Sequence, residues 1–158
     1  MTGKAQTLKA DLHLHTNECP RDSSIQYNAR ELIDTAAGHG YDVLSITNHD
    51  MVTWNTDLRD YAADRGILLI PGIELTVNHK HVLVYNADVR SGPLDSFEQL
   101  RELKTPDSLM IAPHPFYPGA HSLRSRLFRW RNLFDAVELC HFYTNWIGFN
   151  RRAVQAAC

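Results

Sequence analysis

With 158 residues, of which 44% are hydrophobic and 22% charged, the chain has the size and composition of a single globular domain, residues 1–158. Its net charge of −2 gives no reason to expect nucleic-acid or membrane binding through bulk electrostatics, and no apolar run is long enough to cross a bilayer. Three irregularly spaced cysteines do not form a disulfide framework, so we expect a reducing, cytoplasmic environment.

Strand and helix patterns alternate along the whole chain. In chain order they predict a strand at 7–16, a helix at 29–37, a strand at 41–47, a helix at 53–65, a strand at 67–77 interrupted by Pro71-Gly72, a strand at 81–85, a helix at 96–104, a strand at 108–114, a helix at 123–134, a strand at 136–141 and a helix at 149–157. This alternation is typical of parallel β/α units. An α/β fold is therefore expected.

The first predicted strand carries potential metal ligands at alternating positions, Asp11, His13 and His15. Residues at i and i+2 of a strand point to the same face, so these three side chains are expected to project together. Two imidazoles on one face can chelate a divalent metal. The chain also contains nine histidines, more than a protein of this size needs for packing.

Further histidine and glutamate residues fall at the ends of other predicted strands. In an α/β sheet or barrel, functional groups gather at the carboxyl ends of the strands. His81 is the exception, because it begins its strand and would reach this edge only if that strand ran antiparallel. The residues at or near strand ends are His15, His49, Glu74, His114 and His141.

Five motifs in this order resemble the PHP (polymerase and histidinol phosphatase) family. They are D-L-H-L-H-T at 11–16, T-N-H-D at 47–50, P-G-I-E at 71–74, H-V-L-V-Y at 81–85 and A-P-H-P at 112–115. The resemblance covers nearly the whole chain. It implies a distorted seven-stranded β/α barrel, TIM-like in outline, that binds two to three divalent metals and hydrolyses phosphoesters.

The resemblance also implies a ligand for each metal. His13 and His15 would bind the first metal, Glu74 would bridge the first and second, His81 and His114 would complete the second, and Asp22 with His49 would match the third. Asp22 could equally be a loop cap. Nitrogen and carboxylate ligands without thiolates suit Zn, Mn or Fe.

The chain departs from the family pattern in two places. Asn48 stands where family members usually carry Asp, and the Asp-x-His pair of the family's last strand has no counterpart before Cys158. The sequence is therefore expected to be a truncated form or to take the missing ligands from another chain or from solvent. An incomplete barrel would leave open strand edges and apolar surface, so either self-association or poor solubility is expected.

Several other polar residues are assigned supporting parts. Asp11 is expected to support the metal ligands from deeper in the strand, and Asp50 to orient His49 or to cap the following turn. His141, His121 and Arg124 are candidates for substrate contact; a structural hydrogen bond is the alternative for His141, and a solvated helix face for Arg124.

The function expected from these features is a metal-dependent phosphoesterase acting on a phosphorylated small metabolite or a nucleotide. The metals would lower the pKa of a bound water, which then attacks phosphorus. Two alternatives remain open at this point. One is a catalytically incomplete PHP module that binds metal or has a structural role, and the other is a metallohydrolase that cleaves a C–N bond.

Overall fold

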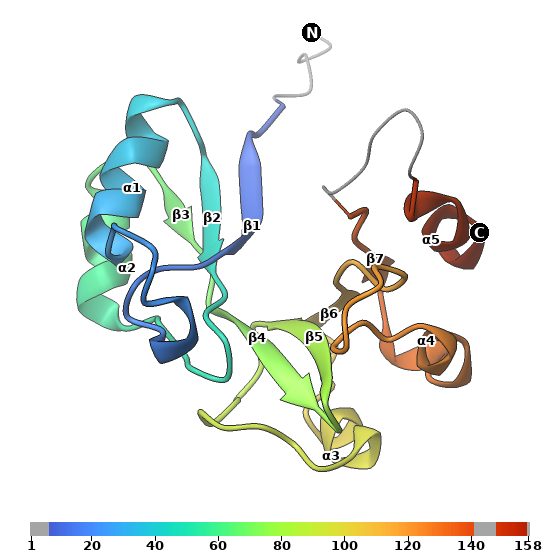
Figure 1. Cartoon of the computed structure of the whole chain (residues 1–158). Coiled ribbons are helices and arrows are strands. Elements are labelled where there is room, and N and C mark those ends of the chain that lie inside the picture. Colours follow the sequence, from blue (N-terminus) through green and yellow to red (C-terminus); the bar gives the residue numbers. More distant parts are fainter. Residues whose placement is uncertain (1–6, 141–147, 158) are drawn as a thin grey trace, which may run out of the picture.

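The computed structural model describes residues 7–140 and 148–157 and contains two β-sheets with helices around them (Figure 1). The first sheet has three parallel strands, and the second has four strands. The strands are β1 (Ala10–Leu14), β2 (Val43–Ile46), β3 (Leu68–Leu69), β4 (Gly72–Val77), β5 (Lys80–Tyr85), β6 (Leu109–Ala112) and β7 (Ala136–Val137). The helices are α1 (Ala29–Gly38), α2 (Thr56–Ala63), α3 (Phe97–Glu102), α4 (Ser125–Arg129) and α5 (Asn150–Ala157), with 3-10 turns η1 (Pro20–Asp22) and η2 (Arg131–Leu133).

The first sheet, in the order β1-β2-β3, is covered on one face by α1 and α2 (Figure 1). Both helices begin at an asparagine, because Asn28 and Asn55 accept hydrogen bonds from the free backbone N–H groups of the first turn. The helices and strands enclose one apolar cluster. Its buried members are Ala29, Ile33, Ala36, Leu44, Ile46, Leu58, Ala62, Ile67 and Leu69.

The second sheet starts with a tight hairpin between β4 and β5. Val77 pairs with Lys80, so Asn78 and His79 form a two-residue turn, and both have positive φ angles, 45° and 62°. This is the conformation of a type I′ turn, which matches the twist of antiparallel strands. β5 and β6 are also antiparallel, and only β7 runs parallel to its neighbour β6.

The two sheets meet where β2 ends and β4 begins. The Glu74 N–H lies 3.2 Å from Thr47 O and donates to it, and the Asp50 N–H donates to Glu74 O at 3.0 Å. Gly72 lies so close to the neighbouring sheet that a Cβ atom there would overlap the Ser45 hydroxyl. This junction places Glu74 next to the residues that follow β2.

The prediction of a distorted seven-stranded TIM-like β/α barrel is wrong. The described residues form two sheets and no closed barrel, and β1 and β7 each pair with one strand only. A parallel barrel needs a crossover after every strand, whereas the turn at Asn78-His79 returns the chain directly and makes β5 antiparallel. The predicted strand at 67–77 is divided between the sheets, because Pro71 separates β3 from β4.

Two elements near the C-terminal end are shorter than predicted. The expected helix at 123–134 is divided into α4 and η2, and the expected strand at 136–141 is reduced to the two residues of β7. Within the described ranges, no helix combines the length and apolar composition that crossing a membrane requires.

Candidate metal centre

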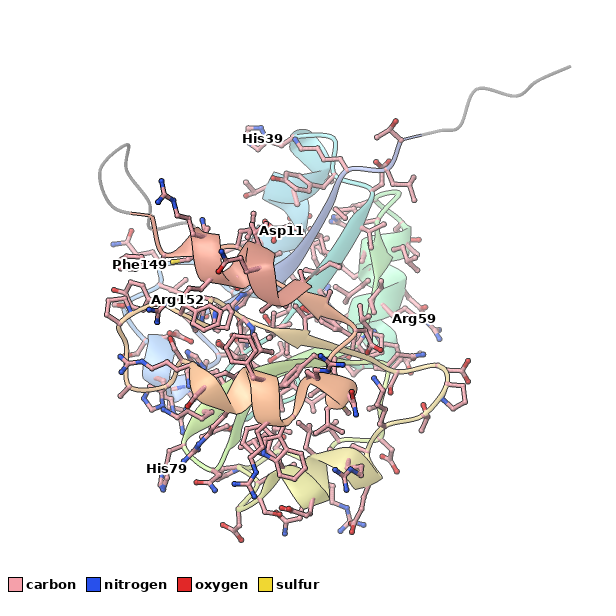
Figure 2. All side chains as sticks on the ribbon, turned by 90° about the vertical axis from the view of Figure 1, so that its right-hand side faces the viewer. Asp11, His39, Arg59, His79, Phe149 and Arg152 are labelled. Atoms are coloured by element: carbon pink, nitrogen blue, oxygen red, sulfur yellow. The ribbon has the colours of Figure 1, made fainter. Side chains whose placement is uncertain are left out.

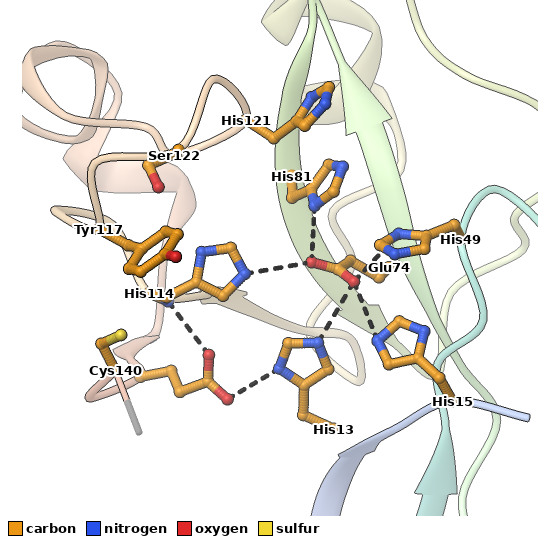
Figure 3. Close-up of a pocket in the computed structure, with 12 residues that line it drawn as sticks. His13, His15, His49, Glu74, His81, His114, Tyr117, His121, Ser122 and Cys140 are labelled. Atoms are coloured by element: carbon orange, nitrogen blue, oxygen red, sulfur yellow. Dashed lines mark hydrogen bonds and ion pairs between the residues drawn. The ribbon is translucent and has the colours of Figure 1, made fainter. Parts of the chain in front are cut away.

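The side chain of Glu74 is buried, with 1% exposed, at the centre of five histidine rings (Figure 3). One carboxylate oxygen, Oε2, lies 3.3 Å from His13 Nε2, 3.2 Å from His15 Nε2 and 3.1 Å from His49 Nδ1. The other, Oε1, lies 2.9 Å from His81 Nδ1 and 3.5 Å from His114 Nε2. The two oxygens therefore face different sets of ring nitrogens, as a carboxylate that bridges two cations would.

The first sheet supplies three of these rings from the carboxyl ends of β1 and β2. His13 lies in β1 and His15 directly after it, so the alternation of the strand turns both rings toward Glu74. Asn48 joins the segment after β2 to the segment after β1: its Oδ1 accepts from the Thr16 N–H at 2.8 Å and its Nδ2 donates to Thr16 Oγ1 at 2.8 Å. A carboxylate cannot donate, so the Asn that departs from the PHP pattern fits this double contact.

The second sheet brings its rings to the same place by a different route. His81 pairs with Thr76 across the β4–β5 hairpin, which puts the start of β5 beside the end of β4. From the sequence, His81 was expected to reach this edge only if its strand ran antiparallel, and β5 does run antiparallel to β4. His114 follows β6 and has a φ of 31°, in the left-handed region that a histidine rarely adopts.

Sequence reasoning missed Glu138, which follows β7. Its Oε1 lies 2.8 Å from His13 Nδ1, and its Oε2 accepts from the His114 backbone N–H at 3.1 Å. Because a carboxylate accepts and does not donate, the contact keeps the proton of His13 on Nδ1 and leaves Nε2 to act as a ligand. The available signal was its position near the end of the predicted strand at 136–141, where His141 is the last residue and the predicted site residue.

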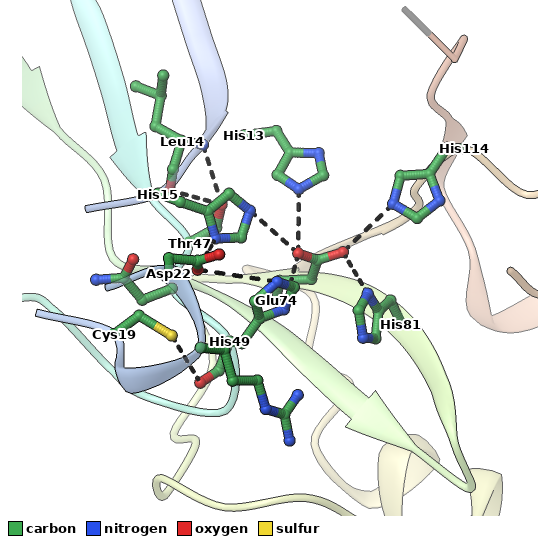
Figure 4. Close-up of polar contacts among 12 residues, drawn as sticks. His13, Leu14, His15, Cys19, Asp22, Thr47, His49, Glu74, His81 and His114 are labelled. Atoms are coloured by element: carbon green, nitrogen blue, oxygen red, sulfur yellow. Dashed lines mark hydrogen bonds and ion pairs between the residues drawn. The ribbon is translucent and has the colours of Figure 1, made fainter. Parts of the chain in front are cut away.

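Three further carboxylates were predicted to belong to this centre. Asp22 Oδ2 lies 3.1 Å from His15 Nδ1 and 3.9 Å from His49 Nε2, and these three residues form a compact group of ligand atoms (Figure 4). Asp11 Oδ1 accepts from the His13 backbone N–H at 3.3 Å and supports the strand rather than the ring.

Asp50 holds the strand that carries Glu74. It accepts from the Thr76 N–H at 2.6 Å and Oγ1 at 2.8 Å, and pairs with Arg21 at 2.8 Å. These contacts anchor β4, whereas an orienting contact with His49 or a cap of the following turn was expected. Asp50 thus acts on the position of Glu74 through the backbone.

The electrostatics of the cluster favour an ionised Glu74. Burial opposes its charged form, but the surrounding rings of His114, His13, His15 and His81 outweigh burial and hold the pKa of Glu74 far below its usual range. Burial likewise lowers the pKa of His13, yet its contacts with Glu138 and Glu74 raise it to about 10, so a cation that binds at Nε2 would have to displace the proton of that nitrogen. The pKa of His49 falls to about 4 through burial, against the attraction of Glu74, so this ring is neutral at pH 7.

Two buried ring nitrogens of the cluster, His81 Nε2 and His114 Nδ1, have no partner among the described residues. Four further buried atoms form no hydrogen bond there and are held only by the ion pairs of the cluster: His15 Nδ1, Asp22 Oδ2, His49 Nδ1 and Glu74 Oε1. A buried polar atom without a partner costs about 1–3 kcal/mol. The nitrogen and oxygen lone pairs of this set suit a divalent cation such as Zn, Mn or Fe.

The ligand atoms gather into three compact groups that share members. They are His13, His15 and Glu74; His15, Asp22 and His49; and His49, Glu74 and His81. The first group contains the residues expected to hold the first metal, and the second adds His15 to Asp22 and His49, which were expected at the third site. The third group joins His49 to His81, whereas the resemblance paired His81 with His114. The residues therefore fit two or three cations that share Glu74, His15 and His49.

A cavity of about 370 Å³ opens over the cluster (Figure 3). His121 lies at its wall, with its ring stacked on that of His81 at 4.5 Å, and Ser122 and Tyr117 also line it. Arg124 does not line this cavity but a separate groove. His141 lies outside the described residues.

The comparisons with known proteins leave the function open. No family model matches the chain. It is similar to an uncharacterized protein of Methanocaldococcus jannaschii, with 27% identity over 146 residues that cover 86% of this chain and 83% of that protein. Because this relative is itself uncharacterized, function must be argued from the site.

Proposed function

We propose that this chain is a metal-dependent phosphoesterase of the PHP type, which hydrolyses a phosphorylated small molecule or a nucleotide. The observation that carries the proposal is the placement of Glu74, whose two oxygens face separate sets of histidine nitrogens. A carboxylate in this position can hold two cations close together, which is the arrangement used to hydrolyse phosphate esters. The proposal keeps the chemistry that the resemblance implies and not its barrel.

The residues divide between the cations as follows. His13 and His15 with Glu74 Oε2 would hold the first, and His81 and His114 with Glu74 Oε1 the second. His49 and Asp22 would add a third position next to His15. Bound divalent metals lower the pKa of a coordinated water and stabilise the charge that develops on the leaving oxygen.

The other side chains prepare the site for an anion. Glu138 keeps the proton of His13 on Nδ1 and, through the His114 N–H, fixes the start of the loop that lines the cavity. The buried Ser122 hydroxyl has no hydrogen-bond partner among the described residues and can donate to a phosphate oxygen. His121 can do the same from the exposed wall of the cavity.

The test is elemental analysis of the purified chain by mass spectrometry, followed by hydrolysis assays. We expect two or more metals per chain, lost in His13→Ala/Glu74→Ala. The matched control is His39→Ala/Glu98→Ala, which removes the same residue types at exposed positions outside the cluster and should retain the metals.

The assays compare phosphomonoesters and phosphodiesters with cyclic amides. Phosphate release that depends on added Zn, Mn or Fe and is lost in the double variant supports the proposal. Metal binding without turnover would favour a binding module instead, and cleavage of amides alone would favour a C–N hydrolase. Absence of bound metal after reconstitution would overturn all three.

A further inference from the structure

A second hollow, of about 700 Å³, lies between the loop after β6, α4 and the start of α5. Its lining combines three arginines with three phenylalanines. They are Arg124, Arg151 and Arg152, and Phe116, Phe128 and Phe149. Figure 2 shows Phe149 and Arg152 on this side of the molecule, and we call the hollow the arginine groove.

The charge of the arginine groove is uncompensated. All three arginines are exposed, none of them forms an ion pair with a described residue, and no described Asp or Glu lines the groove. Three arginines elsewhere form ion pairs, Arg21 with Asp50, Arg59 with Asp60 and Arg65 with Asp34. A chain with a net charge of −2 therefore concentrates three free cations in one concave surface. The net charge of the chain therefore does not predict the local positive charge of this surface, which is suited to binding an anion.

The aromatic side chains give the groove flat apolar faces beside the charges. Phe128 is 55% exposed, and its ring lies 5.9 Å from that of Phe116. An exposed ring next to guanidinium groups can stack on a planar base while the arginines contact phosphates. A small inorganic anion would contact the guanidinium groups but would make no use of the aromatic rings beside them.

The groove and the metal centre share one wall. Phe116 and Pro118 line the groove, whereas Tyr117 and Gly119, from the same loop, line the cavity over the metal centre. The ring of Tyr117 lies 6.4 Å from that of His114 and 5.7 Å from that of Phe149. A ligand in the groove would therefore lie next to the centre without occupying it.

We propose that the arginine groove binds single-stranded nucleic acid. The arginines would contact successive phosphates, and the exposed ring of Phe128 would stack with an unpaired base. A duplex keeps its bases stacked inside and offers no face for this ring, so single strands should bind more tightly. Binding rests on the groove alone and needs neither metal nor turnover, so it stands or falls separately from the proposed hydrolysis.

The experiment is fluorescence anisotropy of a labelled oligothymidylate of about ten nucleotides, with the full chain in EDTA and at several salt concentrations. We expect Arg124→Gln/Arg151→Gln/Arg152→Gln to weaken binding about tenfold or more and to lower the salt slope by about two, since each phosphate contact on a single strand contributes about 0.7. Arg151→Gln/Arg152→Gln, which changes only the exposed start of α5, should give part of this loss.

The matched control, Arg59→Gln/Arg90→Gln/Arg101→Gln, removes the same charge at exposed sites outside the groove and should bind as the original chain does. Phe128→Ala should weaken binding about tenfold without changing the salt slope, because stacking releases no counterions. Equal losses in the control and groove variants would overturn the proposal. So would duplex binding as tight as that of the single strand, or binding to phosphatidylserine vesicles without binding to the oligonucleotide.

Discussion

The two sheets contribute to one metal centre by opposite routes. In the first sheet, parallel strands β1 and β2 deliver His15 and His49 at their carboxyl ends, as expected for β/α units. In the second sheet, a hairpin turns the chain back, so that His81 at the start of β5 lies near Glu74 in β4. Strand direction therefore decides which residues meet. The first residue of a strand lies at one end of the sheet when the strand runs parallel to its neighbour and at the opposite end when it runs antiparallel.

The two halves of the fold, each built around one sheet, are alike in that neither is complete alone. The first has its own helices and apolar cluster, and so does the second, but neither holds the full set of ligands. The centre forms only where the halves join, at the contacts between β4 and the residues after β2. Folding of the two halves should therefore be coupled, and the coupling can be tested.

The largest expected effect comes from opening a cavity in either apolar cluster. Leu44→Ala in the first half and Leu75→Ala in the second each remove a buried side chain and should lower the free energy of unfolding by about 2–5 kcal/mol. Scanning calorimetry should show one transition that both variants shift, because the halves share the junction. Leu68→Ala, at a residue 61% exposed, is the control and should change little. Two separate transitions would contradict the coupling.

A smaller effect is expected at the junction itself. In Gly72→Ala the new Cβ would overlap the Ser45 hydroxyl and lie 2.9 Å from Tyr85 Cδ1, so the sheets must separate or shift. We expect a loss of about 1–3 kcal/mol in urea unfolding, together with weaker metal binding. Gly38→Ala, where a Cβ meets no atom within 4 Å at the end of α1, should be neutral or slightly stabilising. Equal effects of the two substitutions would contradict the role of Gly72.

Glu138→Gln tests the contact between the two sheets in which Glu138, after β7, accepts from the ring of His13 in β1. The substitution removes the charge that holds the His13 proton on Nδ1, so we expect metal affinity to fall about 10–100-fold, measured by competition with a chelator. Glu102→Gln, on the exposed side of α3, supplies a matched loss of charge. Unchanged affinity in Glu138→Gln would show that His13 needs no such partner.

The smallest effect concerns a contact within the second half alone. Lys104 lies 2.7 Å from Asp135 Oδ2, which also accepts from the Met110 N–H at 2.8 Å. Burial opposes the charged form of Asp135, but Lys104 and the Met110 N–H outweigh it and hold its pKa below the ordinary 3.8. Because the pKa of Asp135 is lower in the folded chain than in the unfolded chain, its charge stabilises the fold at pH values above the pKa of the unfolded chain. This stabilisation is lost as the pH falls through the pKa of the folded chain.

Asp135 is exposed and its ion pair with Lys104 is screened by solvent, so Asp135→Asn should cost only about 0.5–1 kcal/mol at pH 7, and the difference from the original chain should shrink toward about pH 3. Urea unfolding at both pH values measures it. Asp88→Asn, at an exposed carboxyl outside these contacts, is the control. A difference that stayed constant with pH would show that the charge of Asp135 contributes nothing.

Local patterns in the sequence predicted much of the secondary structure. The helix predicted at 29–37 is observed at Ala29–Gly38, and that at 149–157 at Asn150–Ala157. These elements depend on apolar spacing and on caps such as Asn28, which are visible within a few residues. The residue types of the candidate centre were visible for the same reason, since His13 and His15 share one face of one strand.

The sequence by itself determined these segments and the chemistry of their side chains, but only the tertiary structure decided how they meet. The direction of β5 depends on two positive φ angles at Asn78 and His79, and from that direction follow the place of His81 and the absence of a closed barrel among the described residues. Glu138 reaches His13 across 125 positions, and Arg124 faces a groove rather than the metal centre. Such placements depend on the pairing of distant strands, and no local pattern specifies which strands pair.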